Sequence, residues 1–128
     1  MRPLAMSLAV SLAGSVASAA SVPTPGDVQF TMPAEFQGEW NGNLEHCRTG
    51  LNDSRLRIAA TALEFYESGG PVKAVVRRGS FEIIVVAELS GEGQSWLASN
   101  HFILSSDSSY IISRGAGGSD LIRYRCPQ

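Results

Sequence analysis

The chain has 128 residues and carries 10 lysine and arginine residues against 12 aspartate and glutamate residues, a formal net charge of −2. This length suits one small domain. The slightly acidic balance argues against binding to nucleic acid or to an anionic membrane, both of which attract basic proteins. We therefore expect neither kind of partner.

Residues 1–20 have the pattern of a secretory signal peptide. One positive charge, Arg2, precedes a weakly apolar segment, and small residues at 17–20 suit a cleavage site. Serines and a glycine dilute the apolar segment, so we expect no membrane span. The sequence thus predicts an exported protein, periplasmic or secreted and soluble after removal of this peptide. An uncleaved helical tail is the alternative.

The remaining chain divides into residues 21–34 and residues 35–128. Prolines and a glycine in the first part predict an extended leader. In the second part, turn residues separate short runs in which apolar and polar residues alternate. These runs lie at about 37–46, 54–59, 62–68, 71–78, 81–89, 95–104, 109–114 and 120–126. They predict an all-β domain over 35–128, an eight-stranded antiparallel up-and-down (meander) barrel, closed or nearly closed because closure protects the strand edges.

Three predicted hairpin turns set the register of the middle strands, at residues 60–61, 69–70 and 79–80. The third of them places Ala74 opposite Val85. A slip by one residue turns a whole strand over, so the agreement of the three hairpins favours one inner face. That face comprises Leu56, Ile58, Leu63, Phe65, Val72, Ala74, Val76, Phe81, Ile83 and Val85.

The run at 95–104 allows two orientations of its side chains. The inward set is either Trp96, Ala98, Asn100 and Phe102, or Leu97, Ser99, His101 and Ile103. We favour the first set because it buries two aromatic rings.

The two cysteines, Cys47 and Cys126, lie near the two ends of the predicted domain. In an exported protein, an even pair predicts a disulfide. A bond that closes so long a loop would stabilise the fold by roughly 4 kcal/mol. The alternative, a catalytic thiol or metal ligand at Cys47 beside His46, is disfavoured by oxidising surroundings and by the lack of a C-x-x-C spacing. How Cys47 reaches Cys126 stays open, because the predicted strands put them at opposite ends of a strand pair.

The stretch Gly38-Glu39-Trp40 opens the first predicted strand. It resembles the Gly-x-Trp of the calycin group of β-barrels, which includes lipocalins and avidin-like proteins. Lipocalins add an arginine that packs over this tryptophan at the closed base of the barrel, and Arg123 or Arg125 on the last strand matches that element. The resemblance implies a ligand site at the barrel mouth. The short chain, without a C-terminal helix, argues against a deep lipid pocket, and a simple core tryptophan beside a closely packed glycine is the alternative.

Motifs of an enzyme or of a cofactor site are missing from the sequence. No nucleophile stands near a base, and His46 and His101 lack the partner spacing of a zinc site. The glycine-rich segment at 114–120 has neither the lysine nor the following helix of a phosphate-binding loop. We expect no enzymatic activity, no cofactor and no metal.

Two functional hypotheses remain. In the first, the barrel mouth binds a small molecule, with Asn100 and the loop at 90–94 as sources of orienting hydrogen bonds. In the second, the barrel is a protein-binding module, for example an exported inhibitor of a lysozyme or protease. The predicted registers favour the second by leaving Val75, Ile84 and Val86 outside as an apolar strip, which is typical of a partner surface or of self-association. The sequence does not identify the ligand, the partner or the oligomeric state.

Overall fold

The computed structural model describes residues 3, 9–15, 27–50, 52–115 and 118–128. The predicted signal peptide, residues 1–20, falls mostly outside the described residues and stays a prediction. In the described ranges the strands are β1 (Val28–Gln29), β2 (Gly38–Asn41), β3 (Leu56–Ile58), β4 (Ala62–Phe65), β5 (Gly69–Arg77), β6 (Glu82–Gly91), β7 (Gln94–Leu104), β8 (Tyr110–Arg114) and β9 (Asp120–Arg125). Two short 3-10 helices, η1 (Ala34–Phe36) and η2 (Leu44–His46), flank β2.

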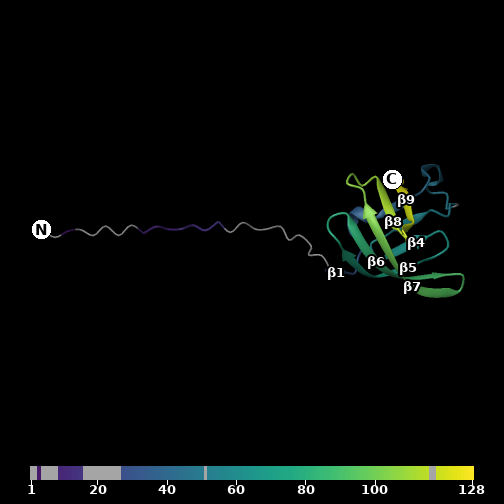
Figure 1. Cartoon of the computed structure of the whole chain (residues 1–128), viewed down its shortest axis with the longest axis horizontal. Helices are drawn as coiled ribbons and strands as arrows, with labels where there is room; N and C mark the ends of the chain where they lie inside the picture. The colour runs from purple at the N-terminus through teal and green to yellow at the C-terminus, as the bar shows by residue number, and fades with distance from the viewer. Residues whose placement is uncertain (1–2, 4–8, 16–26, 51, 116–117) are drawn as a thin grey trace.

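The strands β2 to β9 form a closed antiparallel barrel in which sequence neighbours pair, as Figure 1 shows. The first and last barrel strands meet where Trp40 pairs with Arg125, and pairing of β5 with β6 completes the ring. The predicted eight-stranded up-and-down barrel is confirmed. Closure pairs most of the barrel strands along both edges, which protects a domain of this size against edge-to-edge association, although β7 pairs with β8 only over His101–Leu104.

The segment predicted as a leader contributes to the barrel. Its strand β1 pairs with β5, with Val28 opposite Val76. Met32 follows β1, is 2% exposed, and donates its backbone N–H to the carbonyl of Ala60 at 2.7 Å. The barrel interior therefore begins to fill before residue 35.

The buried core lies inside the barrel and comes from the strands β2 to β8, together with Met32 and the helix η1. It comprises Met32, Phe36, Trp40, Leu56, Ile58, Leu63, Val72, Val75, Ile83, Val85, Ala87, Leu89, Phe102, Leu104 and Ile111, with Phe65 and Ala98 packed against it. The side chains fill most of the space in a barrel of eight short strands. The first predicted hairpin, between β3 and β4, has the predicted register, with Leu56 opposite Phe65.

The second predicted turn, at Gly69-Gly70, is wrong. The chain turns earlier, where the backbone N–H of Phe65 donates to the carbonyl of Ser68 at 2.7 Å, and both glycines lie in β5. A Cβ on Gly70 would stand 1.8 Å from the carbonyl oxygen of Glu88. The glycine is there because two backbones approach closely, not because a turn requires positive φ.

The predicted register of β5 against β6 is wrong by one residue. The pairing shifts between Val72 and Ala74, so that Val75 pairs with Val85 and is fully buried. A β-bulge of this kind reverses the inward and outward alternation of the strand beyond it. Ala74 and Val76 therefore leave the predicted inner face, and Val75 is not part of an outer strip.

Two further orientations can be compared with the sequence. Phe81 is 47% exposed and not inward, because it lies in the turn before β6 begins at Glu82. In β7 the favoured orientation is confirmed, since Phe102 is fully buried and Ala98 packs against the core while Leu97 is 70% exposed. Trp96 is still 42% exposed, because the β6–β7 hairpin continues beyond the part of β7 that pairs with β8 (Figure 1).

Candidate functional site

One end of the barrel, which we call the base, is closed around Trp40. This side chain is fully buried, and its indole Nε1 donates to the carbonyl of Phe36 in η1 at 3.0 Å. The guanidinium carbon of Arg125 lies 4.1 Å from the centroid of the tryptophan ring. A cation at this distance over an indole is attracted to its electron-rich face. Of the two predicted arginines, Arg125 is the one over Trp40.

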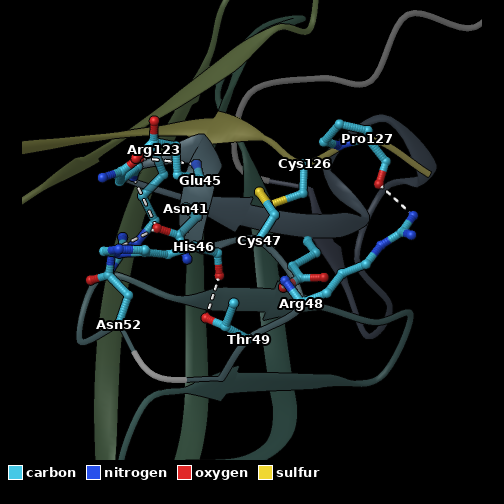
Figure 2. The surroundings of a disulfide bond; sticks show 12 residues. Asn41, Glu45, His46, Cys47, Arg48, Thr49, Asn52, Arg123, Cys126 and Pro127 are labelled. Carbon is cyan, nitrogen blue, oxygen red and sulfur yellow. Dashed lines mark hydrogen bonds between the residues drawn. A yellow bond between two sulfur atoms is a disulfide. The ribbon is translucent and has the colours of Figure 1, made fainter.

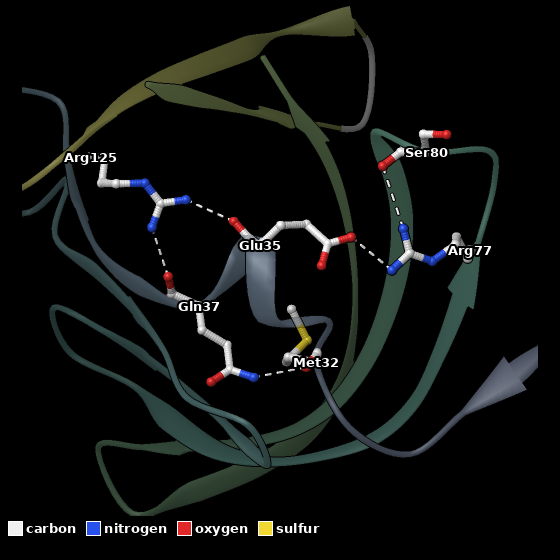
Figure 3. A network of polar contacts seen from close by, with 6 residues as sticks. All are labelled: Met32, Glu35, Gln37, Arg77, Ser80 and Arg125. Carbon is white, nitrogen blue, oxygen red and sulfur yellow. Dashed lines mark hydrogen bonds and ion pairs between the residues drawn. The ribbon is translucent and has the colours of Figure 1, made fainter. Parts of the chain in front are cut away.

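All three side-chain nitrogens of Arg125 donate to backbone carbonyls, as partly seen in Figure 3. Nε donates to Ser108 at 2.9 Å, Nη1 to Gln37 at 2.8 Å and Nη2 to Glu35 at 2.7 Å. Gly38 makes room for this arrangement, because a Cβ there would stand 3.0 Å from Nη1 and the residue has a φ of 135°. Arg125 thus fastens η1 and the loop before β8 to the last strand.

An ion pair adds to the base. Glu35 in η1 accepts from Nη2 of Arg77 on β5 at 2.8 Å, as Figure 3 shows. Burial by itself would raise the pKa of Glu35. Hydrogen bonds from the backbone and from Arg77, together with the Arg77 charge, outweigh burial and lower this pKa below its ordinary value. The pair joins η1 to the end of β5.

The predicted disulfide between Cys47 and Cys126 is confirmed, with 5.7 Å between the two Cα atoms (Figure 2). The connection from β2 to β3 folds back along β2, where the backbone N–H of Arg48 donates to Glu39 at 2.9 Å. This return brings Cys47 level with the end of β9. The predicted conflict between the two cysteines therefore disappears, because Cys47 lies in a loop and not at the end of a strand.

A buried asparagine holds the rest of that connection. Asn41 is fully buried, and its Oδ1 accepts from the backbone of Asn43 at 2.9 Å, from Asn52 at 3.0 Å and from Ser54 at 3.1 Å. His46 contacts the same cluster through its Nδ1, 2.8 Å from Asn52. His46 thus takes part in the hydrogen-bond network that holds the connection between β2 and β3.

The opposite end of the barrel, which we call the mouth, contains a cavity of about 330 Å³. The strands β4 and β8 end there and β9 begins there, so inward side chains from several strands surround the space. Five of them matter for its chemistry: Phe65, Asn100, Ser113, Leu121 and Arg123. A concave space that combines apolar walls with a few convergent polar groups is typical of a small-molecule site.

Arg123 places a buried positive charge at the mouth. The residue is 5% exposed, its Nε donates to the carbonyl of Ser54 at 2.6 Å, and its Nη1 donates to Oγ of Ser113 at 2.7 Å. Burial lowers the pKa of this guanidinium to about 10, so it stays protonated at neutral pH. Within the described part of the chain, no carboxylate forms an ion pair with Arg123, and its Nη2 has no hydrogen-bond partner.

Asn100 adds a second free donor at the mouth. Its Nδ2 is buried and has no hydrogen-bond partner among the described residues. Buried polar groups in proteins are nearly always paired. The Nδ2 of Asn41 and the Nε of Arg77 are also buried without a partner among the described residues, but of these three residues only Asn100 lines the cavity at the mouth. The loop at 90–94, predicted together with Asn100, contributes to a different hollow beside Glu67 and Trp96.

A hollow of about 370 Å³ also lies on the outside of the barrel beside the disulfide. Arg48 and Arg57 line it, but so does the carboxylate of Glu39, which already accepts a hydrogen bond from the Arg48 backbone. Arg125 also lines this hollow, but its three side-chain nitrogens are already paired with backbone carbonyls. The mouth differs because its described lining residues include no aspartate and no glutamate.

The predicted outer strip of Val75, Ile84 and Val86 does not form one surface. Val75 is fully buried, while Ile84 and Val86 are half-buried on the outside of β6. Exposed apolar side chains gather instead on the outside of β8 and β9. Tyr110, Ile122 and Tyr124 are 37%, 44% and 44% exposed, and the two tyrosines lie opposite each other across the strand pair.

Within the described residues, no three histidine, cysteine, aspartate or glutamate side chains gather into a group that could hold a metal ion. His101 instead contacts the carboxylate of Glu82 on the neighbouring strand. Among the parts of the chain that the structure describes, no helix has the length and apolar character needed to cross a membrane.

Comparison of the chain with protein-family models, with curated proteins and with solved structures finds no match.

Proposed function

We propose that this protein is a non-enzymatic binding protein that takes a small molecule at the mouth of its barrel. The observation that carries the proposal is the cavity of about 330 Å³ with a buried, unpaired Asn100 amide and a buried Arg123 that lacks a carboxylate partner. Polar groups in this state cost free energy in the empty protein, and a ligand that pairs with them recovers it.

The arrangement at the base supports a relationship to calycin barrels. A glycine two residues before the buried Trp40, and Arg125 packed over its ring, correspond to the elements that this group uses to close a barrel. In that group the open end of the barrel is where ligands bind. The small cavity suits a compact molecule and not a long acyl chain, because the core side chains already fill the interior below it. The disulfide is compatible with the predicted export.

Native mass spectrometry of protein purified from its own host tests the proposal. We expect the folded protein to retain a small molecule that is released on unfolding. Ser113→Phe should fill the cavity and abolish retention, because Ser113 faces the mouth. Ile112→Phe is the matched control, since this neighbour lies on the opposite face of β8 and should leave retention unchanged. Protein that carries no small molecule, or equal retention by both variants, would contradict a ligand site at the mouth.

A second candidate function, protein binding or self-association, is favoured by the exposed side chains of Tyr110, Ile122 and Tyr124 on β8 and β9. Aromatic side chains often carry the binding energy of protein interfaces. Tyr124→Lys should then abolish self-association or partner capture without unfolding the protein. Tyr66→Lys is the control, because Tyr66 is also 44% exposed but lies in the turn before β5. Sedimentation and co-purification that do not change in Tyr124→Lys would rule out this surface.

A further inference from the structure

We infer that the ligand of the mouth carries a carboxylate, held by the guanidinium of Arg123 and the amide of Asn100, on a compact apolar body. This inference rests on the proposed function and specifies the chemical class of its ligand. It follows from the charge, the free donors and the apolar walls of one cavity.

The charge argument begins with the burial of Arg123. A charge taken out of water is costly, and proteins nearly always pair such a charge with an opposite one. Arg123 is 5% exposed, and its two hydrogen bonds go to neutral oxygens, of Ser54 and Ser113. An anionic ligand supplies the counter-charge that the described residues do not.

Two further basic residues, Arg114 and His101, line the cavity, and each has an acidic partner. Arg114, at the end of β8, lies 3.5 Å from Asp120, and His101 contacts the carboxylate of Glu82. The mouth therefore has one uncompensated positive charge. A ligand with a single negative charge balances it, whereas a dianionic phosphate would bring one negative charge too many.

The geometry of the free donors also suits a carboxylate. Arginine presents its N–H groups in a planar fork that matches the two oxygens of a carboxylate, and Nη2 of Arg123 is the free part of that fork. The Nδ2 of Asn100 lines the same cavity and has two N–H groups to donate. Ser113 accepts from Arg123 at 2.7 Å, so its own hydroxyl hydrogen is still available as a donor.

The apolar walls define the rest of the ligand. Phe65 and Leu121 line the cavity beside the polar groups, and the Arg123 guanidinium carbon lies 5.8 Å from the centroid of the Phe65 ring. A flat or short apolar body can contact this ring while its carboxylate meets the arginine. An aromatic acid combines both features at a size that suits the cavity.

Benzoate is a suitable probe, and benzamide is its neutral analogue of nearly the same shape. Protein purified from an exporting host is titrated with each compound, and the side-chain N–H signals of Asn100 and Arg123 are followed by NMR. We expect benzoate to shift both signals and to bind at least about tenfold more tightly than benzamide, because a buried charge pair discriminates strongly against a neutral analogue.

Variants separate recognition of the carboxylate from general attraction of anions. Arg123→Met should remove the preference for benzoate, while Arg57→Met, which deletes a positive charge on the outside of β3, should keep it. Asn100→Asp is the second variant in case Arg123→Met does not fold. It keeps the shape of the side chain and adds a negative charge at the cavity, so benzoate binding should fall at least about tenfold while benzamide binding is maintained.

The outcomes distinguish this inference from the proposed function. Equal binding of benzoate and benzamide at the mouth, or an unchanged preference in Arg123→Met, overturns the carboxylate inference. The proposed small-molecule site would then stand, with a neutral ligand. Benzoate that shifts neither signal also overturns the carboxylate inference. The small molecule released from host-purified protein gives the independent test, since an acid supports the inference and a neutral compound contradicts it.

Discussion

Arg123 and Arg125 lie two positions apart on the last strand, and both project into the barrel, yet their surroundings differ. At the base, every side-chain nitrogen of Arg125 donates to a backbone carbonyl, and the guanidinium covers Trp40. At the mouth, Arg123 makes two hydrogen bonds, and its Nη2 has no partner in the described part of the chain. The same residue type closes one end and leaves donors free at the other.

This difference suits two roles, stabilisation of the fold by the base and the proposed ligand binding by the mouth. Groups that are fully paired within the protein stabilise it and have nothing left to offer a ligand. Groups that are buried but incompletely paired cost stability, and proteins tolerate that cost most often where a ligand completes the pairing. We therefore expect the base to stabilise the barrel, and the proposed ligand site to lie at the mouth. Mutations at the two ends should separate these roles.

The largest expected effect is at the base. Trp40→Ala should lower the free energy of unfolding by about 4 kcal/mol, because it empties a fully buried site and removes the ring under Arg125. Phe65→Ala at the mouth should cost about 1 to 2 kcal/mol, since this ring is only partly buried beside an existing cavity. Urea unfolding of both variants measures the difference. Equal costs would show that the mouth is packed as tightly as the base.

A smaller effect separates the two arginines. Arg125→Met should lower the free energy of unfolding by about 3 kcal/mol, because three backbone carbonyls lose their donors. Arg123→Met should cost less than about 1 kcal/mol, because removal of an uncompensated buried charge offsets the two lost hydrogen bonds. Urea unfolding of both variants measures the two free-energy costs. A cost for Arg123→Met as large as that for Arg125→Met would make Arg123 a structural residue.

Part of this structure could be predicted from the sequence. Alternation and turn spacing predicted the closed barrel, and an even cysteine pair predicted the Cys47–Cys126 bond. The register of β5 could not be predicted, because Gly69 and Gly70 look like a turn in the sequence. Their role depends on the close approach of Glu88 from β6, which is a contact between distant parts of the chain.

The mouth was harder to predict for a different reason. In the last strand, Ile122 and Tyr124 alternate with Arg123 and Arg125, and hydrophobicity alone would turn the apolar pair inward. The structure does the opposite, with Arg123 buried and Ile122 and Tyr124 each 44% exposed. Arginines can face inward here because carbonyl oxygens from other segments pair with them, and those segments are not adjacent in the sequence. Asn100 was predicted to face inward, but its unpaired amide becomes visible only in three dimensions.

The smallest expected effect concerns pH and again compares the two ends. Glu35 at the base pairs with Arg77 at 2.8 Å, and its pKa in the folded protein is lowered. A lowered folded-state pKa stabilises the protein above the ordinary carboxylate pKa of about 4.5, and this contribution is lost as the pH falls through the folded-state value. Glu35→Gln should therefore cost up to about 1 kcal/mol at pH 7, a small effect because the Glu35 side chain is 39% exposed and solvent screens the pair.

The pH dependence of that cost identifies its origin. As the pH is lowered below the folded-state pKa of Glu35, the wild-type carboxylate gains a proton, and the difference between the wild type and Glu35→Gln should shrink towards zero. Glu64→Gln is the matched control, because Glu64 pairs with Arg55 at 2.9 Å beside the mouth but its side chain is 53% exposed. It should cost less at neutral pH, since a more exposed pair contributes less. Urea unfolding from pH 7 down to acid measures both series. A cost for Glu35→Gln that does not change with pH would mean that its carboxylate stabilises the base by packing and not by charge.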